Sequence, residues 1–321
     1  MTDHRRYCLI SPVRNEEQYI RRTLDSVIGQ TVEPALWVIV DDGSTDASAE
    51  ILADYARRIP FIRIVNRADR GFRKVGAGVI EAFNEGYATI EPGDFDYVCK
   101  LDMDLDLPAG YFQGLMERME ADPRIGTCSG KAYFPGPGNP EGRFDGPLVS
   151  ERCGDEMSLG MTKFYRRACF EEIDGFTSQV MWDGIDCHTC RMLGWIACSW
   201  DDPHLRFVHL RPMGSSEKGV FTGRKRHGFG QYFMGTTIPY ILMSGFYRAL
   251  HPPYVIGGLG IVYGYFLSMV QGRERYGDPT FRRYLVRYQR MVMRMGKKAA
   301  IERLNAEGAA VWNNRSSGAR T

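Results

Sequence analysis

The sequence predicts an α/β fold in which a mostly parallel sheet is flanked by helices and followed by a basic, mainly helical C-terminal extension. Three observations carry this prediction. Strand-like apolar runs alternate with helix-like segments over residues 7–104, two of these runs end in acidic turns, and positive charge gathers in the last third of the chain. Such alternation is typical of parallel strands covered by helices on both faces.

The elements of the first half follow from local pattern. Apolar runs predict strands at residues 7–13, 35–40, 61–65 and 95–101. Apolar side chains at helical spacing predict helices at residues 15–29, from Ser44 or Asp46 onward, and at 77–89. Because ligands of parallel sheets bind beyond the carboxyl ends of the strands, the acidic turns at 41–46 and 102–104 mark the expected site.

The second half is less regular. Prolines and glycines at 134–140 exclude regular structure, which returns at 164–170, and a helix is expected at 186–193. A Gly/Ser-rich basic segment with Lys218 and residues 224–226 is expected to be a loop. The uncharged stretch 254–271 is just long enough to span a bilayer, but its four glycines and the lack of a second such segment favour a buried or interfacial helical hairpin. Residues 278–304 predict one long basic helix.

Charge divides the chain into two zones. Residues 1–205 carry 22 Lys and Arg against 34 Asp and Glu, whereas residues 206–321 carry 19 against 5. We therefore expect two domains, 1–211 and 212–321. The basic zone favours peripheral contact with an anionic membrane leaflet, and no motif for binding nucleic acid accompanies it.

The cysteines indicate a reducing compartment. Eight cysteines are scattered without a framework spacing, and the single C-x-x-C at Cys187 and Cys190 has no second pair to form a zinc site. No N-terminal signal peptide is visible in the printed sequence. The expectation is a cytoplasmic protein, placed at the inner face of the cytoplasmic membrane if the basic zone binds lipid.

Asp102 and Asp104 are the strongest candidates for metal binding. They follow the apolar run at 95–101, separated by one residue. Carboxylate oxygens suit a hard cation such as Mg²⁺ or Mn²⁺ far better than Zn²⁺. A cation held there can neutralise a diphosphate.

Three motifs in order resemble the family 2 inverting glycosyltransferases with the GT-A fold. They are Ser11–Glu17 (SPVRNEE), Val38–Asp46 (VIVDDGSTD) and Lys100–Asp104 (KLDMD), and residues 71–86 resemble the stretch that joins the second and third motifs. The resemblance covers about residues 7–211. The segments around Trp182-Asp183-x-x-Asp186 and His209-x-Arg211-Pro212-x-Gly214 are similar to those of a bacterial subgroup.

The resemblance implies a nucleotide-sugar donor, most readily a UDP-sugar, bound at the strand ends. Its donor-binding residues would be Pro12, Arg14, Glu16, Asp42, Lys74 and Asp102, with Trp182 stacking on a sugar and Arg211 pairing with phosphate. Asp104 would be the direct metal ligand, joined by Asp102 and by His209.

An inverting transfer also needs a general base for the acceptor hydroxyl. The resemblance implies Asp183, which lies 11 residues before Gly194, or alternatively Asp186 one turn later. Either carboxylate could instead serve only the helix N-terminus. The acceptor would be a glycan of a cell-envelope or extracellular polysaccharide, or a lipid-linked glycan.

Two other functions remain open. A sugar nucleotidyltransferase also binds a nucleotide and a metal, but it usually has a Gly-rich loop where this chain has Pro12 to Asn15. A non-catalytic scaffold of a polysaccharide-assembly complex could retain the fold. The intact acidic motifs argue against the scaffold.

Overall fold

The computed structural model describes residues 5–72, 74, 76–211, 220–251 and 254–318, without the side chains of residues 220 and 315–318. The chain forms two compact units. Unit 1 consists of Met1–Phe176 and Ile196–Pro212, and unit 2 consists of Thr177–Trp195 and Met213–Thr321.

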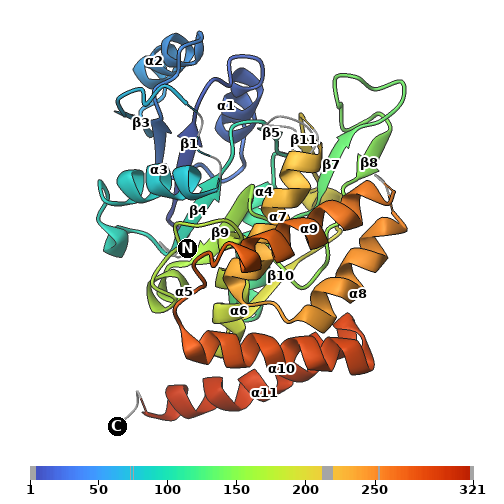
Figure 1. Cartoon of the computed structure of the whole chain (residues 1–321). Helices are drawn as coiled ribbons and strands as arrows, with labels where there is room; N and C mark the ends of the chain where they lie inside the picture. The colour runs from blue at the N-terminus through green and yellow to red at the C-terminus, as the bar shows by residue number, and fades with distance from the viewer. Residues whose placement is uncertain (1–4, 73, 75, 212–219, 252–253, 319–321) are drawn as a thin grey trace. The chain divides into compact units, whose positions relative to one another are not determined.

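A seven-stranded sheet forms the centre of unit 1, in the order β10-β6-β9-β4-β1-β2-β3 (Figure 1). Its strands are β1 (Tyr7–Val13), β2 (Leu36–Asp41), β3 (Ile62–Asn66), β4 (Tyr97–Leu101), β6 (Ile125–Ser129), β9 (Thr162–Arg166) and β10 (Ile196–Ser199). Only β9 pairs antiparallel with its neighbours, β4 and β6. The sheet is therefore mostly parallel, as predicted.

Helices cover both faces of this sheet. The helices of unit 1 are α1 (Ile20–Ile28), α2 (Ser48–Arg58), α3 (Ala77–Tyr87), α4 (Tyr111–Ala121) and α5 (Arg167–Glu172). On one face, α1, α2 and α4 pack on Leu9, Trp37 and Ile39. On the other face, Gly86 of α3 lies against Ile10 and Val40 so closely that a Cβ atom there would stand 2.7 Å from Val40. Burial on both faces explains why β1, β2 and β4 are continuous apolar runs.

A small second sheet extends the carboxyl edge of unit 1. It contains β5 (Leu105–Asp106), β7 (Ala132–Pro135), β8 (Leu148–Ser150) and β11 (Phe207–His209) in the order β5-β11-β7-β8. Strand β11 pairs antiparallel with β5, which places His209 opposite Leu105. This pairing brings the end of unit 1 beside the residues that follow β4. Two short 3₁₀ turns, Pro92–Asp94 and Pro203–Leu205, complete the unit.

Unit 2 is helical where it is described. Its helices are α6 (Trp182–Met192), α7 (Val220–Met234), α8 (Ile238–Ala249), α9 (Ile256–Val270), α10 (Pro279–Met295) and α11 (Lys297–Gly318). Apolar side chains of α6, α7, α10 and α11 share one core that includes Ile185, Phe233 and Leu285. Among the described residues, no helix has both the length and the apolar character needed to cross a bilayer.

The predicted fold class is confirmed, but three predictions in unit 2 are wrong. The uncharged stretch 254–271 forms the single helix α9 rather than a helical hairpin. The expected helix 278–304 is two helices, because Gly296 has φ 83° and ends α10. Residues 224–226 lie in α7 rather than in a loop, while Lys218 is outside the described residues. The proposed division into domains at residue 211 stays a prediction.

Candidate active site

Asp104 lies in the short turn that connects β4 of the central sheet to β5 of the small sheet. The neighbouring Met103 and Leu105 are buried in the core, and Asp104 itself is only 3% exposed. Its backbone carbonyl accepts a hydrogen bond from Leu210 N at 2.9 Å. Strand β4 therefore delivers the carboxylate, and the chain just after β11 fixes it in place.

Five side chains meet at this point and are called here the Asp104 cluster: Glu16, Asp104, Glu151, His209 and Arg211. Arg211 Nε lies 2.5 Å from Asp104 Oδ2, and its terminal nitrogen lies 2.8 Å from Glu16 Oε1. His209 Nε2 lies 3.4 Å from Asp104 Oδ2, while Nδ1 lies 2.9 Å from Glu151 Oε1. The cluster draws on the loop after β1, the β4–β5 turn, the residue after β8, and β11 with its continuation.

Burial and charge act in opposite directions on these groups. Burial by itself raises the pKa of Asp104, but His209 and Arg211 outweigh it and lower that pKa to about 2. Burial by itself lowers the pKa of His209, but Asp104 and Glu151 outweigh it and raise that pKa to about 9. Asp104 is thus a carboxylate whose negative charge is matched by adjacent positive charge.

Asp102 lies beside this cluster and has a different partner. Its backbone N–H donates to Met161 O at 2.8 Å, and its carboxylate accepts a hydrogen bond from Lys100 Nζ. Lys100 is almost fully buried and also donates to Gly160 O at 2.9 Å. Of the three predicted metal ligands, Asp104 and His209 thus lie together, whereas Asp102 is hydrogen-bonded to Lys100.

The residues present fit a divalent cation that arrives with a nucleotide. Over the described part of the chain, no group of three or more His, Cys, Asp or Glu side chains is arranged to hold a metal ion. Mg²⁺ is usually bound by one or two carboxylates plus substrate phosphates rather than by an all-protein cage. Asp104 supplies a carboxylate for such a cation, next to the positive charge of Arg211. His209 could join as a second ligand only with release of the proton that its raised pKa keeps on the ring, since a metal binds the neutral imidazole.

A second polar group follows the ends of β1, β2 and β3. Both carboxylate oxygens of Asp42 accept from arginines: Arg67 at 2.6 Å and Arg70. Arg14 donates to the Asp42 carbonyl oxygen and lies 2.6 Å from Asp69 Oδ1. Asp42 and Arg14 therefore lie together at the carboxyl edge, as their positions after adjacent strands predict.

The remaining predicted donor-site residues have simpler surroundings. Pro12 is in β1 opposite Val40. Exposed Lys74 lies 2.5 Å from Glu81 Oε1 in α3. Their roles toward a ligand remain predictions.

Trp182, Asp183 and Asp186 belong to unit 2, at the start of α6. Met181 precedes the helix with φ 69°, and Asp183 lies in the first turn, where a carboxylate is favoured by the helix dipole. Asp186 is 3% exposed and accepts from Cys187 N at 2.5 Å. Trp182 is buried. Asp183 is only half-buried, so it is more accessible to a ligand than Asp186, the other candidate base.

The sequence analysis missed Glu151, Arg67 and Arg70. Glu151 follows a Pro- and Gly-rich loop that carries no recognisable motif, so only the pairing of β7 with β8 reveals its place. Arg67 and Arg70 come just after β3, and their position at the carboxyl end of a predicted strand could have identified them as candidate site residues.

The family assignment agrees with this architecture. The profile of Glycosyl transferase family 2 matches residues 8–181, which is more than half of the chain. The chain therefore belongs to glycosyl transferase family 2 and is a glycosyltransferase.

Curated relatives match over short stretches. The uncharacterized glycosyltransferase EpsJ of Bacillus subtilis (strain 168) is 36% identical over 90 residues, which are 28% of this chain and 26% of EpsJ. The poly-beta-1,6-N-acetyl-D-glucosamine synthase of Staphylococcus aureus (strain COL) is 30% identical over 118 residues, 36% of this chain and 26% of the synthase. The chain thus spans about a quarter of the length of either relative.

Solved structures extend the similarity of the fold. The mannosyltransferase PcManGT from Pyrobaculum calidifontis, in complex with GDP-Man and Mn²⁺, has a TM-score of 0.53 at 18% identity over 99% of this chain and 81% of that chain. GalNAc-T7 with UDP, GalNAc and Mn²⁺ has a TM-score of 0.56 at 13% identity over 91% of this chain and 58% of that chain. These similarities establish the fold.

Proposed function

We propose that this glycosyltransferase is metal-dependent and inverting, and that it moves one sugar from a UDP-sugar to a hydroxyl group of a glycan. The observation that carries the proposal is the buried Asp104, joined by His209 and Arg211 at the carboxyl edge of the sheet. The Mn²⁺ in PcManGT and the glycan made by the staphylococcal synthase support it. We also propose the bacterial subgroup suggested by the segments at Trp182 and His209.

The chain's own residues can be given roles. Asp104 and His209 would hold Mn²⁺ or Mg²⁺, with Asp102 close by, and the bound cation would stabilise negative charge on the departing diphosphate. Arg211, whose guanidinium bridges Asp104 and Glu16, would pair with a phosphate oxygen of the bound donor. Arg14, Asp42 and Lys74 would bind the nucleoside end.

The transfer step needs a proton acceptor. In this proposal Asp183, or alternatively Asp186, takes the proton of the acceptor hydroxyl. The hydroxyl oxygen forms a bond to the anomeric carbon from the face opposite the nucleotide, and the bond to the diphosphate breaks. The nucleoside diphosphate leaves with the electron pair, so the anomeric configuration inverts.

A donor screen tests the proposal. Thermal unfolding should show stabilisation by one nucleotide-sugar, larger with Mn²⁺ than without it, because ligands that bind only the native state raise the melting temperature. With that donor and a glycan acceptor, Asp104→Asn should abolish UDP release. Asp106→Asn is the matched control, because Asp106 lies two residues on but pairs with Arg22 at 2.6 Å. Equal activity in both variants would contradict the assignment.

The same assays separate the two alternatives. Pyrophosphate release from a nucleoside triphosphate and a sugar phosphate would identify a nucleotidyltransferase. Failure to bind any nucleotide-sugar in the presence of Mn²⁺ would favour a scaffold.

We further propose peripheral contact with an anionic cytoplasmic membrane through unit 2. The surface that supports this is the end of α8 and the start of α9 (Figure 1), where large apolar side chains face solvent: Phe246, Tyr247, Leu250, Tyr254, Val255, Ile256 and Leu259. Phe246 is 70% exposed and Tyr254 64%. Exposed apolar patches of this kind mark interaction sites.

The inward face of α9 explains why these side chains point outward. A Cβ atom at Gly258 would lie 2.2 Å from Gly245 O of α8, and one at Gly264 would lie 2.1 Å from Lys225 O of α7. Small residues thus occupy the helix contacts and large apolar residues the exterior, which is the arrangement of helices that meet lipid. Arg248, in the last turn of α8 between Tyr247 and Leu250, adds a positive charge to this surface.

Vesicle flotation tests this contact. The wild-type protein should float with vesicles that contain phosphatidylglycerol and less with neutral vesicles. Phe246→Ser with Leu250→Ser should abolish flotation, whereas Phe72→Ser, at a position 60% exposed in unit 1, should not. Flotation of the double variant at the wild-type level would overturn the proposal.

A further inference from the structure

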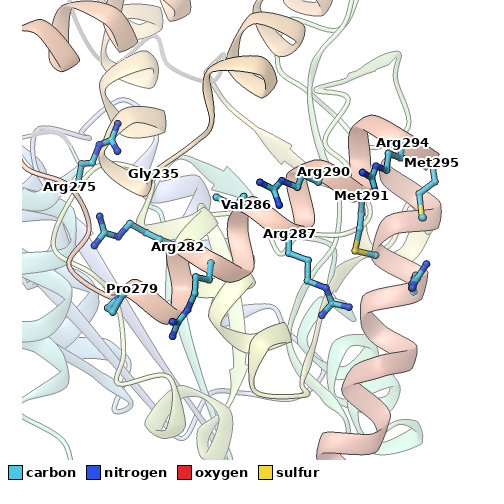
Figure 2. A pocket seen from close by; sticks show the side chains of 12 residues that line it. Gly235, Arg275, Pro279, Arg282, Val286, Arg287, Arg290, Met291, Arg294 and Met295 are labelled. Atoms are coloured by element: carbon cyan, nitrogen blue, oxygen red, sulfur yellow. The ribbon is translucent and has the colours of Figure 1, made fainter.

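A pocket of about 700 Å³ runs along α10 in unit 2 and is lined mainly by arginines (Figure 2). Five of them lie on α10 itself: Arg282, Arg283, Arg287, Arg290 and Arg294. Arg275, from the segment before α10, and Arg303, from α11, complete the lining cations. These seven side chains are called here the arginine groove.

Few carboxylates compensate this charge. Helix α10 contains no Asp or Glu. The residue before it, Asp278, caps the helix N-terminus, where its carboxylate accepts a hydrogen bond from Thr280 N at 2.7 Å. Glu307 serves both Arg287, at 2.6 Å, and Arg303, at 3.3 Å.

Five of the seven arginines have no acidic partner in the part of the chain that the structure describes, and Arg283 contacts only the hydroxyl of Thr280. Within the described residues, no carboxylate lies within ion-pair distance of Arg282, Arg290 or Arg294. Arg275 instead lies over the Tyr232 ring at 4.4 Å. The groove therefore carries a net positive charge that the fold leaves unmatched.

The spacing of the arginines concentrates this charge. Arg283 and Arg287, and Arg290 and Arg294, are four residues apart, and Arg287 and Arg290 are three apart. Like charges at these spacings face each other on one side of a helix and repel. A bound anion would relieve this repulsion, so the clustered arginines favour a site for an anionic ligand.

The shape and chemistry of the groove define the ligand class. A guanidinium group binds phosphate through two parallel hydrogen bonds. From Arg282 to Arg294 the helix rises about 18 Å, so a single phosphate group cannot engage both ends. Val286 and Met291 form an apolar part of the lining, which lowers the local dielectric and strengthens such contacts.

We propose that the arginine groove binds a ligand with several phosphate groups. The phosphates arrive either on a soluble polyphosphate or as the headgroups of anionic lipids. The groove shares no residue with the Asp104 cluster, since all its lining residues belong to unit 2, and the proposal does not rest on glycosyl transfer.

Calorimetric titration with tripolyphosphate, in the presence of EDTA, tests the site. EDTA removes divalent cations, so a cation-dependent nucleotide site stays silent. The wild-type protein should bind tripolyphosphate, and Arg282→Gln with Arg290→Gln should weaken binding at least tenfold. Arg57→Gln with Arg58→Gln on α2 removes equal charge and should leave binding unchanged.

Vesicles that contain phosphatidic acid distinguish the two sources. Flotation that is lost in the groove variant and competed by tripolyphosphate identifies lipid headgroups, whereas tripolyphosphate binding without such flotation identifies a soluble ligand. Circular dichroism melting checks the fold, and the groove variant should melt at the same temperature or higher because repulsion is relieved. Absence of binding in both assays, or equal binding by the groove and control variants, would overturn the proposal.

Discussion

Glu151 holds the ring of His209 by a 2.9 Å contact at Nδ1, and the opposite ring nitrogen faces Asp104. This is the usual order of a carboxylate, a histidine and a metal site, in which the outer carboxylate fixes the tautomer and orientation of the ring. Glu151 is therefore a positioning residue in our account. It acts on the cation only through His209.

Glu151→Gln should weaken Mn²⁺ binding about 10- to 100-fold, the usual effect of losing such an outer carboxylate. Mn²⁺ affinity in the presence of UDP, followed by electron paramagnetic resonance, measures this. Glu141→Gln, at an exposed position in the loop between β7 and β8, is the control. Unchanged Mn²⁺ affinity in Glu151→Gln would remove Glu151 from the site.

Asp183→Asn should lower kcat about 10²- to 10⁴-fold, because that is the range that general-base catalysis contributes. Binding of the donor, measured by calorimetry, should stay at the wild-type level. Asp186→Asn serves as the comparison. If Asp186→Asn alone loses turnover, the roles of the two residues are exchanged, and loss of donor binding in Asp183→Asn would contradict its role as base.

At the scale of elements, the sequence predicts where the strands end, but it does not predict that Gly296 ends helix α10. The predicted positions of Asp42 and Asp104 just after β2 and β4 agree with the structure, because buried parallel strands are continuous apolar runs that end abruptly in polar turns. The sequence predicts one helix over residues 278–304, because its apolar stripe runs from Phe281 to Met295, and only the backbone angle at Gly296 shows the break. It misses Glu151, which depends on pairing between distant strands.

Gly258→Ala should destabilise unit 2 by about 1–3 kcal/mol, the usual cost of overpacking. The added methyl group would lie 2.2 Å from the Gly245 carbonyl oxygen, and that backbone cannot move without parting α8 from α9. Urea unfolding measures the change. Gly277→Ala is the control, since a Cβ atom there meets nothing within 4 Å, and an equal effect at both positions would refute the close helix contact.

His227 on α7 should make unit 2 sensitive to acid. Burial, followed by the charges of Arg248 and Arg224, lowers the pKa of His227 to about 4, below its ordinary value of 6.5. The unfolded chain therefore binds a proton between these pH values while the folded chain does not. The stability is complete above pH 6.5 and falls as the pH drops towards 4.

Because His227 is only partly buried by surface area, we expect a loss of roughly 1–3 kcal/mol across this range. His227→Gln should remove that part of the pH dependence of the unfolding free energy. An unchanged slope between pH 6.5 and 4 in the variant would show that other groups cause it.

At the scale of the whole molecule, acidic and basic residues are separated along the chain, and the two proposed activities follow this separation. Unit 1 carries buried carboxylates and would need a cation to bind a diphosphate. Unit 2 carries the arginine groove and the exposed apolar end of α8 and α9, and would bind phosphate groups and lipid directly. Composition predicted this contrast, whereas the groove itself depends on how α10 and α11 pack.

The affinity for UDP, measured by calorimetry with and without Mn²⁺, tests most directly the claim that Asp104 binds a nucleotide through a cation. We predict that Mn²⁺ tightens UDP binding at least about tenfold in the wild-type protein and has no effect in Asp104→Asn. Equal affinity with and without Mn²⁺ in the wild-type protein, or a full Mn²⁺ effect in Asp104→Asn, would contradict the account.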